Sequence, residues 1–422
     1  MVYKVNDLMY AASEELANNI RTDITFNEPV NEKLLCMAVN TAIKRFPYFA
    51  VKLVRNGENY VMEHNTEPLV ITCGTVGAAL GSAENNFHLF SVTYDTDTVH
   101  VYTSHYITDG NGLFPFIRTM SYLYFHELYP DEGFDTENIA LPDSTIPSLE
   151  ATDDPYPAEP LPCEPVVDTK RPQEILKLND LLEARDKEKV CTSLRMNIQA
   201  KEMMNYISSV DGSPATFVAS LMYKTISDLH PESHLPVVCG MQHQFRKALG
   251  NPYSHMCHVN IVPMVYPDRL RKRGIEMLNT MSRGMLMLRA SSENDMLTVN
   301  AHIENSKKLA GMTLGEKHEI MRQVVKDGIG ENTFEVSYTG RVPWCGLEKH
   351  IRSAAPYIDL SLSGGLSIEI FSVGDRFDIN IMQWGSSRRY FEHFCRLLSK
   401  CGIKFTAKTP FSFELCGISL PT

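Results

Sequence analysis

The segment VHVYTSHYITDGNGLFPF, residues 99–116, contains the side chains whose types and spacing best suit chemistry. His105 lies four residues ahead of the Asp109-Gly110 pair, where a predicted strand gives way to a predicted helix. Imidazole has an ordinary pKa of about 6.5, so it is mostly neutral near pH 7 and can accept a proton from a substrate. His105 is thus a candidate general base, and a metal ligand or an ordinary turn residue are the alternatives.

A metal site at His105 would need more ligands than its neighbours supply. No His-x-x-x-His or Glu-x-x-His pair accompanies His105 and Asp109. A second group of potential ligands, HMCH at 255–258, falls in a stretch that we predict to be a strand, where Cys257 would point away from His258. We therefore expect a structural role for this group and no bound metal.

Two predicted elements hold His105 in place. Alternation along the strand predicted over residues 98–105 puts His105 at the end of an apolar face. After a glycine-rich turn, apolar residues recur at helical spacing from Leu113 to Tyr124, which predicts a helix. Packing on both sides would fix which ring nitrogen faces a substrate.

Asp109 and Gly110 are predicted to shape the turn rather than to take part in chemistry. A carboxylate four residues after His105, across a turn, pairs more readily with an arginine than it acts as a second base. Arg21 and Arg45 are the arginines early in the chain that we expect as partners and as structural residues.

The chain is predicted to form two domains joined by a proline-rich link. Its 422 residues exceed one average domain. Eight prolines occur between Pro142 and Pro172 among acidic and small residues, a composition that favours an extended connection. We place the first domain at 1–150, the link at 151–190 and the second domain at 191–422.

Both halves mix helical and strand patterns, which predicts an α/β protein with mixed sheets. One pattern occurs twice. A strand predicted to begin at Asp97 reaches His105 eight residues later, and one predicted to begin at Asp375 reaches Gln383 eight residues later. An aromatic-rich helical segment follows each, which favours a structural relation between the halves without requiring it.

The composition excludes several classes of protein. A hydrophobic fraction of 43% with 22% charged residues is that of a folded globular chain, and the net charge of −11 argues against nucleic-acid binding. No apolar run approaches the roughly 18 residues of a membrane helix, and the first residues lack the features of a signal peptide. Ten scattered cysteines indicate reduced thiols. We expect a cytoplasmic protein with no nucleic-acid or membrane partner.

The segment SHYITDG resembles the His-His-x-x-x-Asp-Gly motif of the superfamily that contains chloramphenicol acetyltransferase, nonribosomal-peptide condensation domains and alcohol O-acetyltransferases. His105 takes the place of the second, catalytic histidine of that motif, and Ser104 replaces the first. Three further segments resemble parts of these proteins in the same order: AIKRFPYF, FRKALGNPYSHMCHVNIVP and EVSYTGR. The resemblance covers about residues 20–400.

This resemblance implies two related lobes that form a pseudodimer, with His105 in a central tunnel between them. It also implies a coenzyme A-dependent acyltransferase that moves an acyl group, with acetyl as the expected group, to the hydroxyl of a small apolar acceptor. His105 would act as general base, acyl-coenzyme A would be a co-substrate, and no cofactor would be bound permanently. Arg246 and Asn260 match positions of the superfamily that are mainly architectural.

Four basic residues and two hydroxyls complete the predicted site. Ser337 and, second, Thr339 share a face of the strand predicted for EVSYTGR and could donate a hydrogen bond to a tetrahedral oxyanion. The candidates for contact with the coenzyme A phosphates lie in the clusters RLRKR and SSRRY, and they are Arg271, Lys272, Arg273 and Arg388. Plain strand hydroxyls and solvated surface cations are the alternatives.

Two other functions remain open from the sequence. A free-standing condensation-type amide synthase would take its acyl group from a carrier protein, and an inactive binding protein would keep the fold without turnover. The motif does not separate esters from amides or coenzyme A from a carrier as donor. We expect a monomer.

Overall fold

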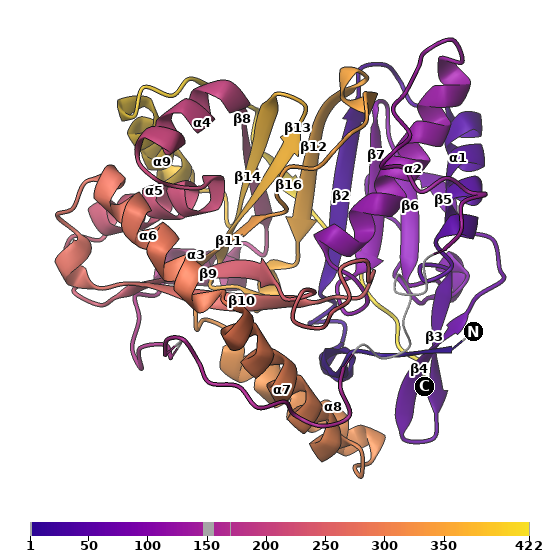
Figure 1. Ribbon diagram of the computed structural model, residues 1–422, viewed down its shortest axis with the longest axis horizontal. Coiled ribbons are helices and arrows are strands. Elements are labelled where there is room, and N and C mark those ends of the chain that lie inside the picture. Colours follow the sequence, from indigo (N-terminus) through magenta and orange to yellow (C-terminus); the bar gives the residue numbers. More distant parts are fainter. Residues whose placement is uncertain (1, 147–155, 169, 422) are drawn as a thin grey trace.

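The computed structural model describes residues 2–146, 156–168 and 170–421 and divides them between two lobes (Figure 1). The main sheet of the first lobe has the strand order β12-β2-β7-β6-β5. These strands are β12 (Ile351–Ile358), β2 (Asn19–Phe26), β7 (Thr98–Ser104), β6 (Phe90–Tyr94) and β5 (Ile71–Cys73). Helices α1 (Glu32–Arg45) and α2 (Gly110–Leu128) pack on it, and a smaller sheet joins β1 (Val2–Lys4), β4 (Asn59–His64) and β3 (Val51–Asn56).

The second lobe is built on a larger mixed sheet in the order β10-β9-β11-β13-β14-β8-β15, with β16 also paired to β8. Its strands are β10 (Val259–Tyr266), β9 (Val237–Gln244), β11 (Phe334–Tyr338), β13 (Leu366–Val373), β14 (Arg376–Trp384), β8 (Cys191–Gln199), β15 (Phe405–Ala407) and β16 (Phe411–Phe413). The helices on the side away from the first lobe are α4 (Ala200–Ser209), α5 (Pro214–Leu229), α6 (Ile275–Arg289) and α9 (Arg389–Lys400). The predicted α/β class with mixed sheets is confirmed.

The two main sheets share a topology. In the first lobe, the strands β2-β7-β6-β5 are neighbours in that order, and in the second lobe β8-β14-β13-β11 are neighbours in the same way. In each series the last pair is parallel and the others are antiparallel. The strands β7 and β14 lead into α2 and α9, so the unit that the sequence pattern predicts at Asp97 and Asp375 occurs in both lobes.

Several segments cross between the lobes. Strand β12, from late in the chain, pairs antiparallel with β2 at the edge of the first sheet and also contacts β13 and β14 of the second. Near the end of the chain, Ile418 forms a bridge with Leu80. Helices α7 (Ser292–Leu309) and α8 (Leu314–Gly328) extend from the second lobe, and Met321 belongs to the core of the first (Figure 1). These exchanges hold the lobes together.

The predicted link is only partly described, because residues 151–155 and 169 lie outside the described residues. Between them the chain runs along α7, where the Asn300 side chain accepts a hydrogen bond from the Leu161 amide at 2.8 Å. The span predicted as link also contains helix α3 (Asn179–Lys187) before β8 begins at Cys191. The domain boundaries remain a prediction.

Within the described part of the chain, no helix combines the length and apolar character that crossing a membrane requires.

Candidate active site

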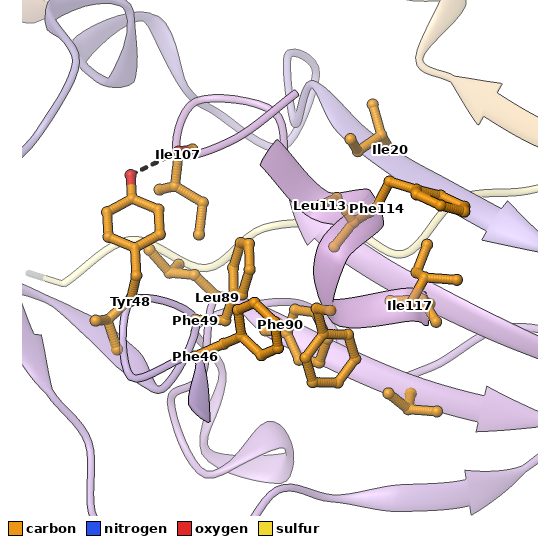
Figure 2. Packing of buried hydrophobic residues seen from close by; sticks show 14 of the residues in the cluster. Ile20, Phe46, Tyr48, Phe49, Leu89, Phe90, Ile107, Leu113, Phe114 and Ile117 are labelled. Carbon is orange, nitrogen blue, oxygen red and sulfur yellow. Dashed lines mark hydrogen bonds between the residues drawn. The ribbon is translucent and has the colours of Figure 1, made fainter. Parts of the chain in front are cut away.

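His105 is the first residue after β7, at the start of the turn that leads to α2. The apolar side of this corner is packed by aromatic rings from the segment after α1 (Figure 2). The Tyr48 hydroxyl donates a hydrogen bond of 2.6 Å to the Ile107 carbonyl, and the His105 amide donates one of 2.9 Å to the Asn18 carbonyl. The corner is therefore anchored from both sides, as the sequence pattern predicts.

The His105 ring has a fixed orientation. Its Nδ1 lies 2.9 Å from the Thr108 carbonyl, and because a carbonyl can only accept, Nδ1 carries the hydrogen. No hydrogen bond to Nε2 is seen among the described residues, and the ring lines a cavity of about 270 Å³. A neutral His105 would thus present an unprotonated Nε2 to a molecule in that cavity.

The sequence predicts that His105 is mostly neutral near pH 7, but the structure favours its protonated form. Burial acts to lower the pKa of His105, but the neighbouring Cys257 sulfur and the Asp109 carboxylate stabilise the charged form and raise the pKa to about 9. The neutral, proton-accepting form therefore becomes the major one only in alkaline solution. The main reason for the difference is the proximity of Cys257, which the linear sequence does not reveal.

Cys257 is the neighbour that sequence reasoning missed. Its Sγ lies 3.6 Å from His105 Nδ1. The HMCH segment was predicted to lie in a strand, but β10 begins only at Val259, and the preceding residues form an irregular loop that turns Cys257 toward the histidine. Only the cysteine within FRKALGNPYSHMCH, a segment that resembles part of the superfamily, could have suggested this contact. Among the described residues, no cluster of side chains is placed to hold a metal ion.

Asp109 joins the two lobes at this corner. It is the N-cap of α2, where its Oδ1 accepts from the Gly112 amide at 3.0 Å. The same carboxylate accepts from Arg246 Nη2 at 2.8 Å and from the His258 amide at 2.9 Å. Burial acts to raise the pKa of Asp109, but Arg246 and these amides outweigh it and the pKa is lowered. These contacts are consistent with the predicted structural role of Asp109.

The arginine partner of Asp109 is Arg246, not Arg21 or Arg45. Arg21 is buried beside Asp23, with Nε 2.9 Å from its carboxylate, and Arg45 Nε donates to Ser144 at 2.9 Å. Both candidates lie in the first lobe, as Asp109 does, whereas the true partner comes from the second lobe. Proximity in sequence was therefore misleading, because Asp109 and Arg246 are 137 residues apart in the chain and meet only where the two lobes come together.

The start of α2 passes very close to the second lobe. A Cβ atom on Gly112 would lie 2.3 Å from the His255 carbonyl oxygen, so only glycine fits at this position. The His255 ring in turn donates from Nδ1 to the Gly112 carbonyl at 2.9 Å. Gly110 has more room, since its Cβ would lie 3.3 Å from the Thr339 methyl group.

The cavity at His105 brings together most of the predicted catalytic and turn residues. It lies between the ends of β7 and α2 on one side and β9, β11, β12 and β13 on the other. The predicted residues among its lining are His105, Asp109, Gly110, Ser337 and Thr339. The lining also includes Glu369, a buried acid on β13 that the sequence pattern does not single out. Arg21 and Arg45 are not part of it.

A second cavity lies on the other side of Cys257. It has a volume of about 400 Å³, and its lining includes Lys4, Cys257 and Lys307. Because Cys257 lines this cavity and touches His105, which lines the first one, the two cavities approach each other at this pair of side chains.

The predicted basic residues lie elsewhere. Arg271 is occupied by main-chain carbonyls, with Nη1 2.9 Å from the His230 oxygen, and its Nε lies 3.0 Å from Asp268. Lys272, Arg273 and Arg388 are exposed, and none of the four lines either of the two cavities.

No protein-family model matches the chain, and no curated protein matches it. Solved structures do. TRI101 of F. sporotrichioides, complexed with coenzyme A and T-2, is 10% identical with a TM-score of 0.60, and the match covers 97% of this chain and 99% of that one. TRI101 of F. graminearum, complexed with coenzyme A and deoxynivalenol, is 11% identical with a TM-score of 0.59, over 94% and 97%.

A third match is the condensation domain of the Monacolin K polyketide synthase MokA, at 10% identity with a TM-score of 0.54, over 95% of this chain and 97% of that one. Because the likeness extends over nearly the whole of each chain, it shows a shared two-lobed fold. The fold expected from the His-x-x-x-Asp-Gly segment is thereby confirmed.

Proposed function

We propose that this protein is a coenzyme A-dependent acyltransferase that moves an acyl group, acetyl in the simplest case, from the thioester to the hydroxyl of a small molecule. One observation carries the proposal: His105 donates from Nδ1 to the Thr108 carbonyl while its ring lines a cavity between the lobes. That arrangement is what a general base needs, a fixed ring with one nitrogen left for the substrate. The predicted cytoplasmic location and monomeric state belong to this proposal and depend on the sequence alone.

The proposed reaction needs only groups of this chain and the two substrates. Nε2 of His105 removes the proton of the acceptor hydroxyl as its oxygen attacks the thioester carbonyl carbon. The carbon–sulfur bond then breaks, the ester is released, and the coenzyme A thiolate takes the proton back from His105. A base of this kind contributes about 10²- to 10⁴-fold to the rate.

The tetrahedral intermediate carries a negative oxygen that requires a hydrogen-bond donor. Ser337 and Thr339 both line the cavity on β11 or directly after it. Ser337 lies against the Glu369 carboxylate and hydrogen-bonds to it, so its single proton is already engaged. We therefore assign the oxyanion contact to Thr339 first and Ser337 second, the reverse of the order expected from sequence.

Two findings support the donor and the acceptor class. The TRI101 structures contain coenzyme A together with T-2 or deoxynivalenol, so this fold accommodates coenzyme A and a small molecule at once. The two cavities that meet at Cys257 and His105 offer separate places for two such substrates here. We propose that the acceptor occupies the cavity at His105 and that the donor enters through the cavity with Lys4 and Lys307.

The proposal is tested by release of free coenzyme A from acetyl-coenzyme A in the presence of a panel of small alcohols. His105→Ala should lower kcat/KM by about 10²- to 10⁴-fold with no change in melting temperature. His126→Ala is the matched control, because His126 is an exposed histidine on α2. Equal activity in all three proteins would contradict a base at His105.

The alternative of an amide synthase is favoured by the likeness to the MokA condensation domain. It predicts that amines and a loaded carrier protein react faster than alcohols and acetyl-coenzyme A. An inactive binding protein predicts no acyl transfer with any pair of substrates, and no effect of His105→Ala. The same assay, with amines and a carrier-bound donor added to the panel, separates the three functions.

A further inference from the structure

Glu369 is a buried acid on β13 that the proposed reaction does not use. Its side chain lines the cavity at His105, yet the residue is only 4% exposed. Strand β13 lies at the junction of the lobes, next to β12 (Figure 1). The carboxylate is in contact with Ser337, the residue paired with it on β11, but Oε1 has no hydrogen-bond partner among the described residues. A buried carboxyl oxygen without a partner is costly, and a positive charge held nearby would offset that cost.

Among the described residues that line this cavity there is no lysine or arginine, and its acids are Asp109 and Glu369. Protonated His105 stabilises the ionised form of Glu369, but in the proposed reaction His105 is neutral when it accepts a proton, and no lysine or arginine of the lining then balances Glu369. Asp109 is already paired with Arg246, at 2.8 Å. Burial raises the pKa of Glu369 to about 7, so its proton is released readily when a positive charge arrives. The cavity is thus electrostatically suited to a cation and unsuited to the phosphates of coenzyme A.

Aromatic rings add to this preference. Tyr338 and Phe371 line the same cavity, Tyr338 from β11 and Phe371 from β13, the two strands that carry Ser337 and Glu369. The faces of such rings attract ammonium groups, most strongly where water is excluded.

We propose that the acceptor carries a cationic amino group in addition to the hydroxyl that is acylated, and that Glu369 binds this group. This inference depends on the proposed function for the identity of the acylated group, but the binding of the cation can be tested separately. It replaces the apolar acceptor expected from the resemblance with an amino alcohol. Glu369 is then a specificity-determining residue, and His105 keeps its role at the hydroxyl.

The test uses two alcohols of the same shape, 3-dimethylamino-1-propanol and 4-methyl-1-pentanol. The first has a protonated nitrogen where the second has a carbon. Because this nitrogen is a tertiary amine, it does not form a stable amide, and only the hydroxyl can be acylated. The measured quantity is the ratio of kcat/KM for the amine to kcat/KM for its neutral isostere. We expect a ratio above about 10 in the wild type, a fall of at least tenfold in Glu369→Gln, and partial recovery in Glu369→Asp, which keeps the charge.

Glu335→Gln is the matched control. Glu335 is an equally buried glutamate, 5% exposed, on the neighbouring strand β11, but it does not line the cavity. Its substitution should leave the ratio within about threefold of wild type. A wild-type ratio near one, or equal ratios in Glu369→Gln and Glu335→Gln, overturns the inference while leaving the acyltransferase proposal intact.

If the wild type acylates neither alcohol but acylates others of the panel, the proposed function stands, and calorimetry then decides the inference. In that case 3-dimethylamino-1-propanol is titrated into wild type, Glu369→Gln and Glu335→Gln. Binding that is weakened at least tenfold only in Glu369→Gln supports a cation site. Absent binding in the wild type, or equal binding in all three proteins, rejects it. Melting temperatures of the variants establish that they are folded.

Discussion

The protonation of His105 is governed by groups from both lobes. Its Nδ1 lies 2.9 Å from the Thr108 carbonyl and 3.6 Å from Cys257 Sγ. The carbonyl fixes the ring, and the sulfur stabilises its charged form. Since only neutral imidazole can accept a proton from the acceptor, the raised pKa of about 9 makes the activity depend on pH in the alkaline range.

The pH profile should therefore rise toward alkaline pH. Below pH 9 the fraction of neutral His105 grows about tenfold with each pH unit, so log kcat/KM should climb with a slope near one and level off above the pKa. Removing the sulfur in Cys257→Ala takes away the largest influence that raises the pKa, and the rise should shift to lower pH. The measurement is kcat/KM for acetyl-coenzyme A between pH 6 and about 10.

Cys36→Ala serves as the control for this shift, because Cys36 lies on α1 and lines neither of the two cavities. Its profile should coincide with that of the wild type. If Cys257→Ala also coincides with the wild type, Cys257 does not influence the base, and the contact at 3.6 Å is only packing.

At the scale of elements, the junction between β7 and α2 is the part of the fold that the site depends on most. The Asp109 carboxylate caps α2 and binds Arg246, and Gly112 allows the first helical turn to lie against the His255 carbonyl. The helix is thereby fixed at its N-terminus by the opposite lobe. Any side chain at 112 would push the lobes apart next to His105.

Gly112→Ala should consequently reduce both stability and activity. The added Cβ would lie 2.3 Å from a main-chain oxygen, and backbone must move to relieve that overlap. Overpacking of this kind costs about 1–3 kcal/mol, which would appear as a lower melting temperature and a reduced kcat/KM. Gly133→Ala is the control, because a Cβ there would meet nothing within 4 Å. Unchanged stability in Gly112→Ala would mean that the lobes adjust without strain.

At the scale of the whole molecule, the two lobes define two cavities of different character. The one at His105 has no lysine or arginine among its described lining residues, whereas the one beyond Cys257 has Lys4 and Lys307 together with the acid Asp7. Lys307 is paired with Glu159, which lies in the described part of the predicted link. Under the proposed function, the two lysines make the cavity beyond Cys257 the better of the two for an anionic donor.

This arrangement predicts which cation contacts the donor. Lys307→Ala should raise KM for acetyl-coenzyme A several-fold, because an ammonium group near a phosphate stabilises the bound state. Lys308→Ala, the next residue on α7, is the control and should leave KM unchanged. A larger effect of Arg388→Ala than of Lys307→Ala, measured in the same assay, would instead favour the basic clusters singled out from the sequence.

The sequence by itself determined the elements and the central residue. Alternation and helical spacing around residues 98–124 place His105 at the corner between β7 and α2. These features are local, because a strand face or a helix N-terminus is specified by residues within a few positions of one another. The two-lobed fold was implied by the resemblance of SHYITDG and the later segments to a known superfamily, and the repeated hairpin-helix unit agrees with it.

Only the tertiary structure decided which groups surround that histidine. Arg246, Cys257 and Glu369 reach the site from loops and strands of the second lobe, more than a hundred residues away in the chain. Such contacts form because β12 and the loop before β10 bring the lobes together, and no periodicity in a single segment encodes that approach. The charge of the base and the polarity of the cavity are therefore properties of the assembled lobes, since both depend on distances between side chains and on exclusion of water.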